Sequence, residues 1–131
     1  MNSINVLQKA LDASSLRQQV ISNNIANADT PGYKSQSVSF ENILKQHLAG
    51  QTSLSGTRTD PKHFVIGDST GLPNPQIVEN SDTTLQNNGN NVDIDQEMTN
   101  MSKNSLWYYS LTNQINNQFQ ELSIAITGRR S

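Results

Sequence analysis

Apolar residues in the first part of the chain recur at alternating spacings of four and three residues. The apolar members of this series are Ile4, Leu7, Leu11, Ile21 and Ile25. Because a 4-3 spacing keeps side chains on one face of an α-helix, the pattern predicts an N-terminal helix over residues 1–28. Ser14 and Gln18 interrupt the apolar stripe, and polar residues at such positions can fix the register of paired helices.

The predicted helix ends at a cluster of residues that disfavours helical backbone. Pro31 restricts the residue before it to extended backbone, and Pro31-Gly32 suits the two central positions of a type II turn. The ring of Tyr33 follows, and we expect it to fold back onto the helix. The complete turn motif is Asn27, Ala28, Asp29, Thr30, Pro31, Gly32 and Tyr33.

The middle of the chain, residues 29–91, contains this turn and otherwise shows a weaker pattern. Apolar residues share a helical face over residues 40–48, which predicts a short helix with Ser39 as its N-cap. Glycine, proline and small polar residues dominate the remainder. Apolar clusters at residues 64–66 and 77–78 predict one or two short strands in an irregular segment.

The C-terminal segment, residues 92–131, carries the longest periodic series. Its apolar members are Ile94, Met98, Met101, Tyr108, Ile115, Phe119, Leu122 and Ile126, and its polar members are Ser105 and Thr112. Asp93 is placed as an N-cap, and Gln96 three residues later resembles a capping box. Gly128 is placed to end the helix. These signals predict a helix of about 34 residues.

Neither long helix can bury its apolar stripe alone, so each needs a partner. The predicted fold class is therefore mainly α, with the two terminal helices forming an antiparallel coiled-coil pair. The irregular middle adds a short helix and one or two short strands. We expect residues 1–28, 29–91 and 92–131 to form one structural unit.

Three aromatic residues, Trp107, Tyr108 and Tyr109, stand at consecutive positions of the predicted C-terminal helix. Consecutive helical residues point in different directions, so we place Tyr108 in the seam between the helices. Trp107 and Tyr109 then point to its flanks. Two interpretations remain open for this pair: partial burial against the middle segment, or anchors for a neighbouring subunit.

The composition of the chain favours packing against a neighbouring subunit. The chain is 33% hydrophobic and 15% charged, whereas typical globular domains are about 45–50% apolar and about 25% charged. Asparagine and glutamine, 17 and 12 residues, occupy much of the difference. Such a chain has little material for a self-contained core. Its polar, weakly charged surface suits packing against copies of itself without like-charge repulsion.

Charge and motif content exclude several classes of function. The net charge is −2 and no basic stripe is present, so we expect no nucleic-acid partner. No apolar run is long enough for membrane insertion, and no cleaved signal peptide is expected. The sequence has no cysteine, no metal-ligand spacing and no nucleophile or phosphate-binding motif. We therefore expect neither a cofactor nor an enzyme activity.

The alternation of Asp93, Asp95 and Glu97 resembles the opening of a calcium-binding loop. Such a loop also requires glycine at its sixth position and glutamate at its twelfth, and those positions hold Met98 and Asn104. Acidic residues that complement the positive end of a helix are the better interpretation.

The segment from Ser22 to Tyr33, SNNIANADTPGY, resembles the N-terminal signature of the flagellar rod, hook and hook-associated proteins. A second similarity covers two segments in the C-terminal part of the chain. One is Asn104 to Tyr108, and the other is a C-terminal motif earlier in the sequence. That C-terminal motif is Val92, Asp93, Ile94 and Asp95, preceded by Asn91. The short chain is similar in length to the rod members of this family, because the distal-rod and hook proteins carry larger middle domains.

The resemblance implies a structural subunit of the proximal rod in the bacterial flagellar basal body. Such subunits polymerise into a hollow drive shaft that transmits torque and encloses the export channel. The implied partners are other copies of the chain, FlgC and distal-rod proteins, the MS-ring adaptor FliE and the flagellar type III export apparatus. The implied location is the periplasmic rod, reached without a cleaved signal peptide. The alternatives are FlgC or another short rod protein, and a non-flagellar helical adaptor module.

Overall fold

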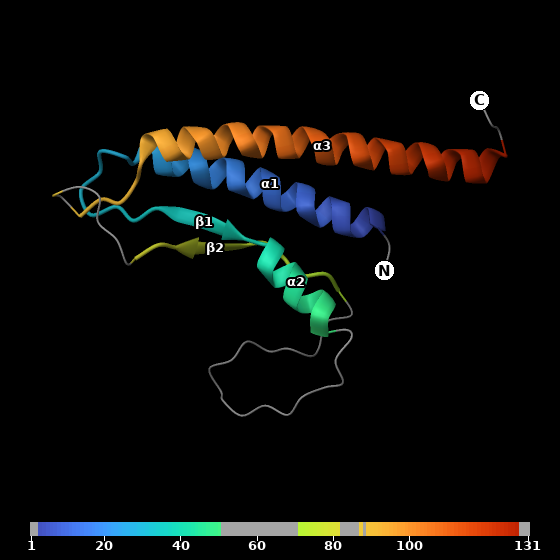
Figure 1. The fold of residues 1–131 in the computed structure, drawn as a ribbon, viewed down its shortest axis with the longest axis horizontal. Coiled ribbons are helices and arrows are strands. Elements are labelled where there is room, and N and C mark those ends of the chain that lie inside the picture. Colours follow the sequence, from blue (N-terminus) through green and yellow to red (C-terminus); the bar gives the residue numbers. More distant parts are fainter. Residues whose placement is uncertain (1–2, 51–70, 82–86, 88, 129–131) are drawn as a thin grey trace.

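The computed structural model describes residues 3–50, 71–81, 87 and 89–128. Two long helices lie side by side, and a small sheet and a short helix lie along the shorter of the two (Figure 1). The elements are α1 (Ser3–Ala26), β1 (Gln36–Ser39), α2 (Glu41–Gly50), β2 (Gln76–Glu79) and α3 (Ile94–Thr127). The predicted fold class is confirmed. The apolar cluster predicted as a strand at residues 64–66 lies outside the described residues.

The two long helices are antiparallel. Near the start of α1, the Ser3 hydroxyl donates a hydrogen bond of 3.0 Å to Gln118 of α3. Near the end of α1, the Asn24 amide donates one of 3.2 Å to Glu97. The C-terminal part of α3 extends past the first turn of α1, as the red end of the ribbon shows in Figure 1.

Local signals define both ends of α3. The Asp93 side chain accepts hydrogen bonds from the backbone N–H groups of Asp95 and Gln96, as an N-cap does. Gly128 adopts a left-handed φ of 62° and donates to the carbonyl of Ile124. The predicted capping residues at both ends are confirmed.

The turn after α1 also follows its local sequence. The backbone N–H of Tyr33 donates to the carbonyl of Thr30 at 3.2 Å, and Gly32 has a φ of +72°. A positive φ at the third turn residue is the mark of a type II turn, so the predicted turn is confirmed. Helix α1 itself ends at Ala26, two residues before the end of the segment predicted as helical.

The two strands form an antiparallel pair in which Gln36 lies opposite Glu79 and Ser39 opposite Gln76. The strand predicted from the cluster at residues 77–78 is confirmed. The N-cap predicted for α2 is wrong. Because Ser39 is the last residue of β1, the helix starts one residue later, and the carbonyl of Phe40 accepts the first helical hydrogen bond.

The buried core is small and lies mainly where the turn, the sheet and the paired helices meet. Its apolar members are Ala13, Val20, Ile21, Ala28, Val38, Phe40, Val92 and Leu111. Polar side chains are buried beside them: Ser14, Asn24, Ser35, Asn90, Asn91 and Asn104. The low apolar content is therefore supplemented by buried hydrogen-bonding groups rather than by larger apolar side chains.

Only part of the apolar series predicted on α3 is covered by the rest of the subunit. Most of the apolar series on α3 is exposed: Ile94, Met98, Tyr108, Phe119, Leu122 and Ile126. The buried residues of α3 are Asn104 and Leu111, and Met101 and Ile115 of the predicted series are half-buried. Six predicted seam residues are thus exposed in the isolated subunit, and Phe119, Leu122 and Ile126 lie beyond Gln118, the residue of α3 that bonds to the start of α1.

The apolar series on α1 lies closer to its partner. Ile21 is buried, and Ile4, Leu7, Leu11 and Ile25 are half-buried. No helix in the described part of the chain combines the length and the apolar character needed to cross a membrane.

Candidate assembly surface

Asn24, near the end of α1, has no exposed surface and holds the first strand in place. Its Nδ2 donates to the Gln36 carbonyl at 2.7 Å, and its Oδ1 accepts from the Gln36 N–H at 2.9 Å. The Tyr33 hydroxyl donates to the same Oδ1 at 3.2 Å. The prediction that Tyr33 folds back onto the helix is confirmed, and Asn24 acts as a hydrogen-bonding partner for the strand backbone.

Asn90 and Asn91 hold the other side of the turn. The fully buried Asn90 amide donates to the carbonyls of Asn27 and Thr30 at 2.9 and 2.8 Å, and its Oδ1 accepts from Val92 N–H. Asn91 accepts from Ser35 N–H at 2.6 Å. The turn after α1 is therefore tied to the backbone that begins α3.

A third polar cluster joins the middle of the two long helices. The Ser14 hydroxyl donates to Asn104 Oδ1 at 3.0 Å. The Asn104 amide donates to the Ser14 carbonyl at 2.9 Å and to Gln18 Oε1 at 3.0 Å. We name Ser14, Gln18 and Asn104 the helix clamp. All buried side-chain polar atoms among the described residues have a hydrogen-bond partner.

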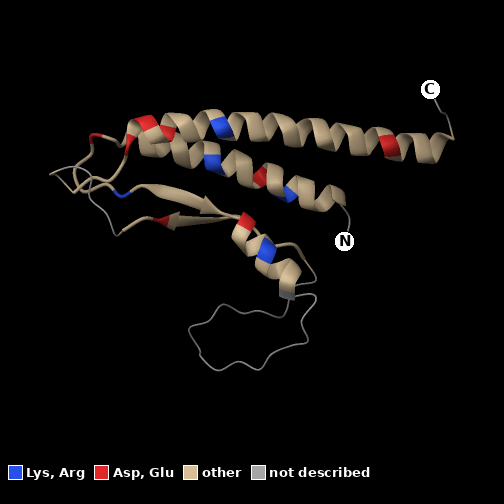
Figure 2. Cartoon of the chain, viewed as in Figure 1, with Lys and Arg blue, Asp and Glu red and all other residues tan. Residues whose placement is uncertain are grey.

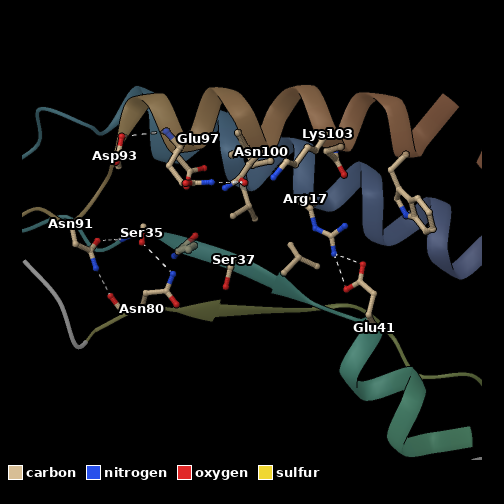
Figure 3. Close-up of a pocket in the computed structure, with 17 residues that line it drawn as sticks. Arg17, Ser35, Ser37, Glu41, Asn80, Asn91, Asp93, Glu97, Asn100 and Lys103 are labelled. Carbon is tan, nitrogen blue, oxygen red and sulfur yellow. Dashed lines mark hydrogen bonds and ion pairs between the residues drawn. The ribbon is translucent and has the colours of Figure 1, made fainter. Parts of the chain in front are cut away.

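Asn104 of the clamp also lines a groove of about 850 Å³ bounded by α1, β1 and the first half of α3 (Figure 3). Arg17 spans this groove and bonds both carboxylate oxygens of Glu41 at 2.7 and 2.9 Å. Glu97 and Lys103 also line it, so the groove carries both signs of charge. In the described ranges no group of three or more histidine, aspartate or glutamate residues is arranged to hold a metal ion.

Two side chains, Glu41 and Tyr33, have shifted pKa values. Burial alone raises the pKa of the Glu41 carboxyl, but hydrogen bonds from Arg17 and the backbone, with the Arg17 charge, bring the net pKa below its ordinary value. Burial raises the pKa of the Tyr33 phenol, and the negative charges of Glu97 and Glu79 raise it further. Tyr33 therefore stays protonated at neutral pH and donates to Asn24.

A series of apolar residues on α3 is exposed. We name this surface the outward stripe of α3 and define it by Ile94, Met98, Tyr108, Phe119, Leu122 and Ile126. Ile126 is 82% exposed. Tyr109 is 67% exposed, and Trp107 is 48% exposed and lines the groove together with β1 and Glu41.

Charge is nearly absent from this part of the molecule. No charged residue occurs between Lys103 and Glu121, and Figure 2 shows the corresponding uninterrupted tan length of α3. The two polar members of the predicted series, Ser105 and Thr112, turn their hydroxyls to carbonyls four residues earlier on their own helix. They therefore make no hydrogen-bond demand on a partner that covers the stripe.

Sequence reasoning did not foresee the structural roles of Asn24, Asn90, Asn91 and Asn104. The available signal was their position, since asparagine next to a helix end or turn often bonds nearby backbone. The predicted C-terminal motif begins with Val92 and Asp93, which lie just before α3. Val92 is buried there, and Asp93 caps the helix. Asp95 follows in the first turn, and Ile94 is exposed.

Comparison with known proteins identifies the family. A family model described as "Flagella basal body rod protein" matches residues 4–34, which cover most of α1 and the turn after it. The flagellar basal body rod protein FlgB of Bacillus subtilis (strain 168) is 41% identical over 126 residues, covering 96% of this chain and 94% of that protein. The chain belongs to the flagellar basal body rod protein family.

Other relatives support the same assignment along nearly the whole chain. FlgB of Borreliella burgdorferi is 35% identical over 133 residues and covers 95% of both chains. FlgB of Aeromonas hydrophila is 35% identical over 124 residues, covering 94% of this chain and 91% of that protein. The family resemblance predicted from the SNNIANADTPGY segment is confirmed, and the protein is a structural subunit of the flagellar basal body rod. A non-flagellar adaptor module is thereby set aside.

Proposed function

We propose that this rod subunit polymerises through the outward stripe of α3 into the proximal rod, as a hollow shaft that transmits torque and encloses the export channel. One observation carries the proposal: the six large apolar side chains of the stripe lie exposed on one helix in a chain that is only 33% hydrophobic. Exposed apolar surface of this kind marks an interaction site in a soluble protein.

The chemistry of the stripe suits permanent assembly. Burying its apolar side chains against a neighbour releases water and stabilises the contact by about 25 cal/mol for each Å² covered. The uncharged length between Lys103 and Glu121 avoids the cost of desolvating charges. Exposed Trp107 and Tyr109 add side-chain types that dominate the binding energy of many interfaces.

The shape of the subunit supports a growing polymer. Helix α3 extends past the start of α1 (Figure 1), and the stripe residues Phe119, Leu122 and Ile126 lie on this extension. A projecting apolar helix fits a different surface of the next copy, and head-to-tail contacts that do not close produce a helical tube. A helix of 34 residues is about 51 Å long at 1.5 Å per residue, which gives each subunit a stiff axial element.

The proposed partners are other copies of this chain, FlgC and the distal-rod proteins above it, and the MS-ring adaptor FliE and the type III export apparatus below it. The proposed location is the periplasmic part of the basal body, with export that needs no cleaved signal peptide. No enzyme activity, cofactor, nucleic acid or membrane insertion is part of this proposal. Membership of the basal body rod family supports assembly with components of this kind.

The test replaces Ile126 with aspartate in a strain that lacks its own copy of the protein. Because a charge within an apolar contact is costly to bury, Ile126→Asp should abolish swimming and leave basal bodies without a rod. Gln120→Asp adds the same charge to an exposed polar position of the same helix, and it should preserve swimming. Secretion of the variant must be measured alongside, so that an export defect is separated from an assembly defect.

Site-specific photocross-linking from position 109 in swimming cells tests the partners. Products that contain another copy of the chain, FlgC or FliE are expected from this exposed aromatic position. Normal rods in the Ile126→Asp strain would overturn the stripe as an assembly surface. Cross-links only to proteins outside the basal body would overturn the proposed partners.

A further inference from the structure

The C-terminal end of α3 projects beyond the helix that it packs against. Ser3, the first residue of α1, bonds to Gln118, so residues 119–127 of α3 extend past α1 (Figure 1). We name residues 119–127 the overhang of α3. Its exposed large apolar side chains are Phe119, Leu122, Ile124 and Ile126. Because α1 does not reach these side chains, a surface of another chain is needed to cover them.

The groove between α1, β1 and α3 contains an open edge of β1. Alternate residues of an antiparallel strand direct their backbone groups to opposite edges, and Asn24 binds both groups of Gln36 on the edge away from β2. Val38, two residues later, therefore directs its N–H and C=O to that same edge. Val38 lines the groove, and no described residue bonds to either group. The groove thus offers one backbone donor and one backbone acceptor to an occupant.

The groove also combines apolar side chains with an unpaired cation. The apolar residues of its lining are Val20, Ile21, Val38 and Trp107. Arg17 is held by Glu41, whereas Lys103 forms no ion pair within the described part of the chain (Figure 3). An occupant that brings apolar side chains and a carboxylate would complement both properties.

The overhang carries such a carboxylate. Glu121 is its one charged residue, and among the described residues it has no ion-pair partner. Lys103 and Glu121 are 18 positions apart, which corresponds to five complete turns and about 27 Å of α-helix. The two charges therefore lie on the same side of α3, too far apart to pair within one subunit. A second copy displaced by this distance along α3 would bring its Glu121 to Lys103 of the first.

We propose that the overhang of one copy docks into the groove of a second copy, with Glu121 facing Lys103. Exposed Gln120 on the overhang supplies an amide of the kind that Asn24 uses to bind the β1 backbone. Contacts between two different surfaces that repeat from copy to copy do not close, and they build a helical polymer. The docking rests on the proposed function, since it names the surface that receives the projecting end of α3.

Disulfide cross-linking tests the docking in a chain that has no cysteine of its own. In K103C/E121C the two cysteines are about 27 Å apart on one helix, whereas a disulfide requires Cα atoms about 4.4–6.8 Å apart. A disulfide between these two positions therefore joins two copies. Oxidation of swimming cells should give a ladder of linked chains, while either single variant can link at most two.

S105C/E121C is the matched control. Exposed Ser105 lies two residues after Lys103, about 200° further around α3, and it is outside the groove lining. Because disulfides form only at short range, this variant should give at least about tenfold less ladder.

Exchange of the two charges tests the same contact without cysteine. Lys103→Glu and Glu121→Lys each place like charges at the proposed contact, and each should reduce the number of rod-bearing basal bodies at least about threefold. The double variant restores opposite charges and should return that number to within about twofold of the unsubstituted strain. Secretion of each variant is measured alongside.

Swimming K103C/E121C cells without a ladder would overturn the docking and leave the rod function standing. An equal ladder from S105C/E121C would overturn it as well. If K103C/E121C cells do not swim, the charge exchange decides. Single reversals without effect, or a double variant as defective as the single ones, then overturn the docking. Normal rods in the Ile126→Asp strain would instead contradict the proposed function.

Discussion

The amide of Asn24 pairs with the backbone of Gln36 as a neighbouring strand would. One bond of 2.7 Å runs to the Gln36 carbonyl, and one of 2.9 Å comes from the Gln36 N–H. A side chain at the end of α1 therefore takes the place of a third strand beside β1. This relationship ties the sheet to the helical pair and explains how a chain with few apolar residues holds its parts together.

Replacing Asn24 with alanine should destabilise the protein strongly. The substitution leaves the Gln36 backbone groups and the Tyr33 hydroxyl without their partner, and each buried orphan costs about 1–3 kcal/mol. We expect urea unfolding to show a loss on the order of 3 kcal/mol or more. Asn23→Ala at the exposed neighbouring position should change stability by less than about 0.5 kcal/mol. Equal effects of the two variants would contradict the role of Asn24.

Replacing Gly32 with alanine should cost about 1 kcal/mol in the free energy of unfolding. The cause is the positive φ of +72° alone, since a Cβ at this position meets no atom within 4 Å. Gly32→Asn should cost less, because asparagine tolerates left-handed backbone better than alanine. Thermal unfolding of the three proteins checks this order. Equal stability of all three would contradict a conformational requirement at this position.

Leu111 and Leu106 differ in burial although both lie on α3. Leu111 is 6% exposed against α1, and Leu106 is 70% exposed. Leu111→Ala should therefore lower the free energy of unfolding by about 2–4 kcal/mol, while Leu106→Ala should change it by less than about 0.5 kcal/mol. Denaturant titration of the purified subunit measures both. A larger loss at Leu106 would mean that the other face of α3 is buried in solution.

The ion pair between Arg17 and Glu41 should make stability depend weakly on pH. The folded pKa of Glu41 lies below its ordinary value, so its contribution is present above the unfolded pKa of about 4.3 and is lost as pH falls through the folded pKa. With the Glu41 side chain 58% exposed, the pair contributes roughly 0.2–1 kcal/mol. The stability difference between the unsubstituted chain and Glu41→Gln should shrink as pH falls from 7 to 3. A difference that grows over this range would contradict the direction of the shift.

Local elements were predictable because their causes lie within a few residues of one another. Asp93 caps α3 through the next two backbone N–H groups along the chain, and Gly32 and Gly128 supply positive φ where the turn and the helix end require it. Interactions of this kind follow from residue type and spacing. The error at Ser39 shows the limit of such reasoning, because a strand partner at Gln76 retained that residue in the sheet.

The sequence by itself therefore determined two long terminal helices, their ends, the turn between α1 and the sheet, and the rod family. Only the tertiary structure decided which face of α3 meets α1. Asn104 is buried in this contact and accepts a hydrogen bond from Ser14, 90 positions away in the chain, and periodicity registers an asparagine only as a polar residue. Hydrogen bonds between residues that are distant in the sequence depend on the folded arrangement, so the apolar pattern alone leaves this buried position out.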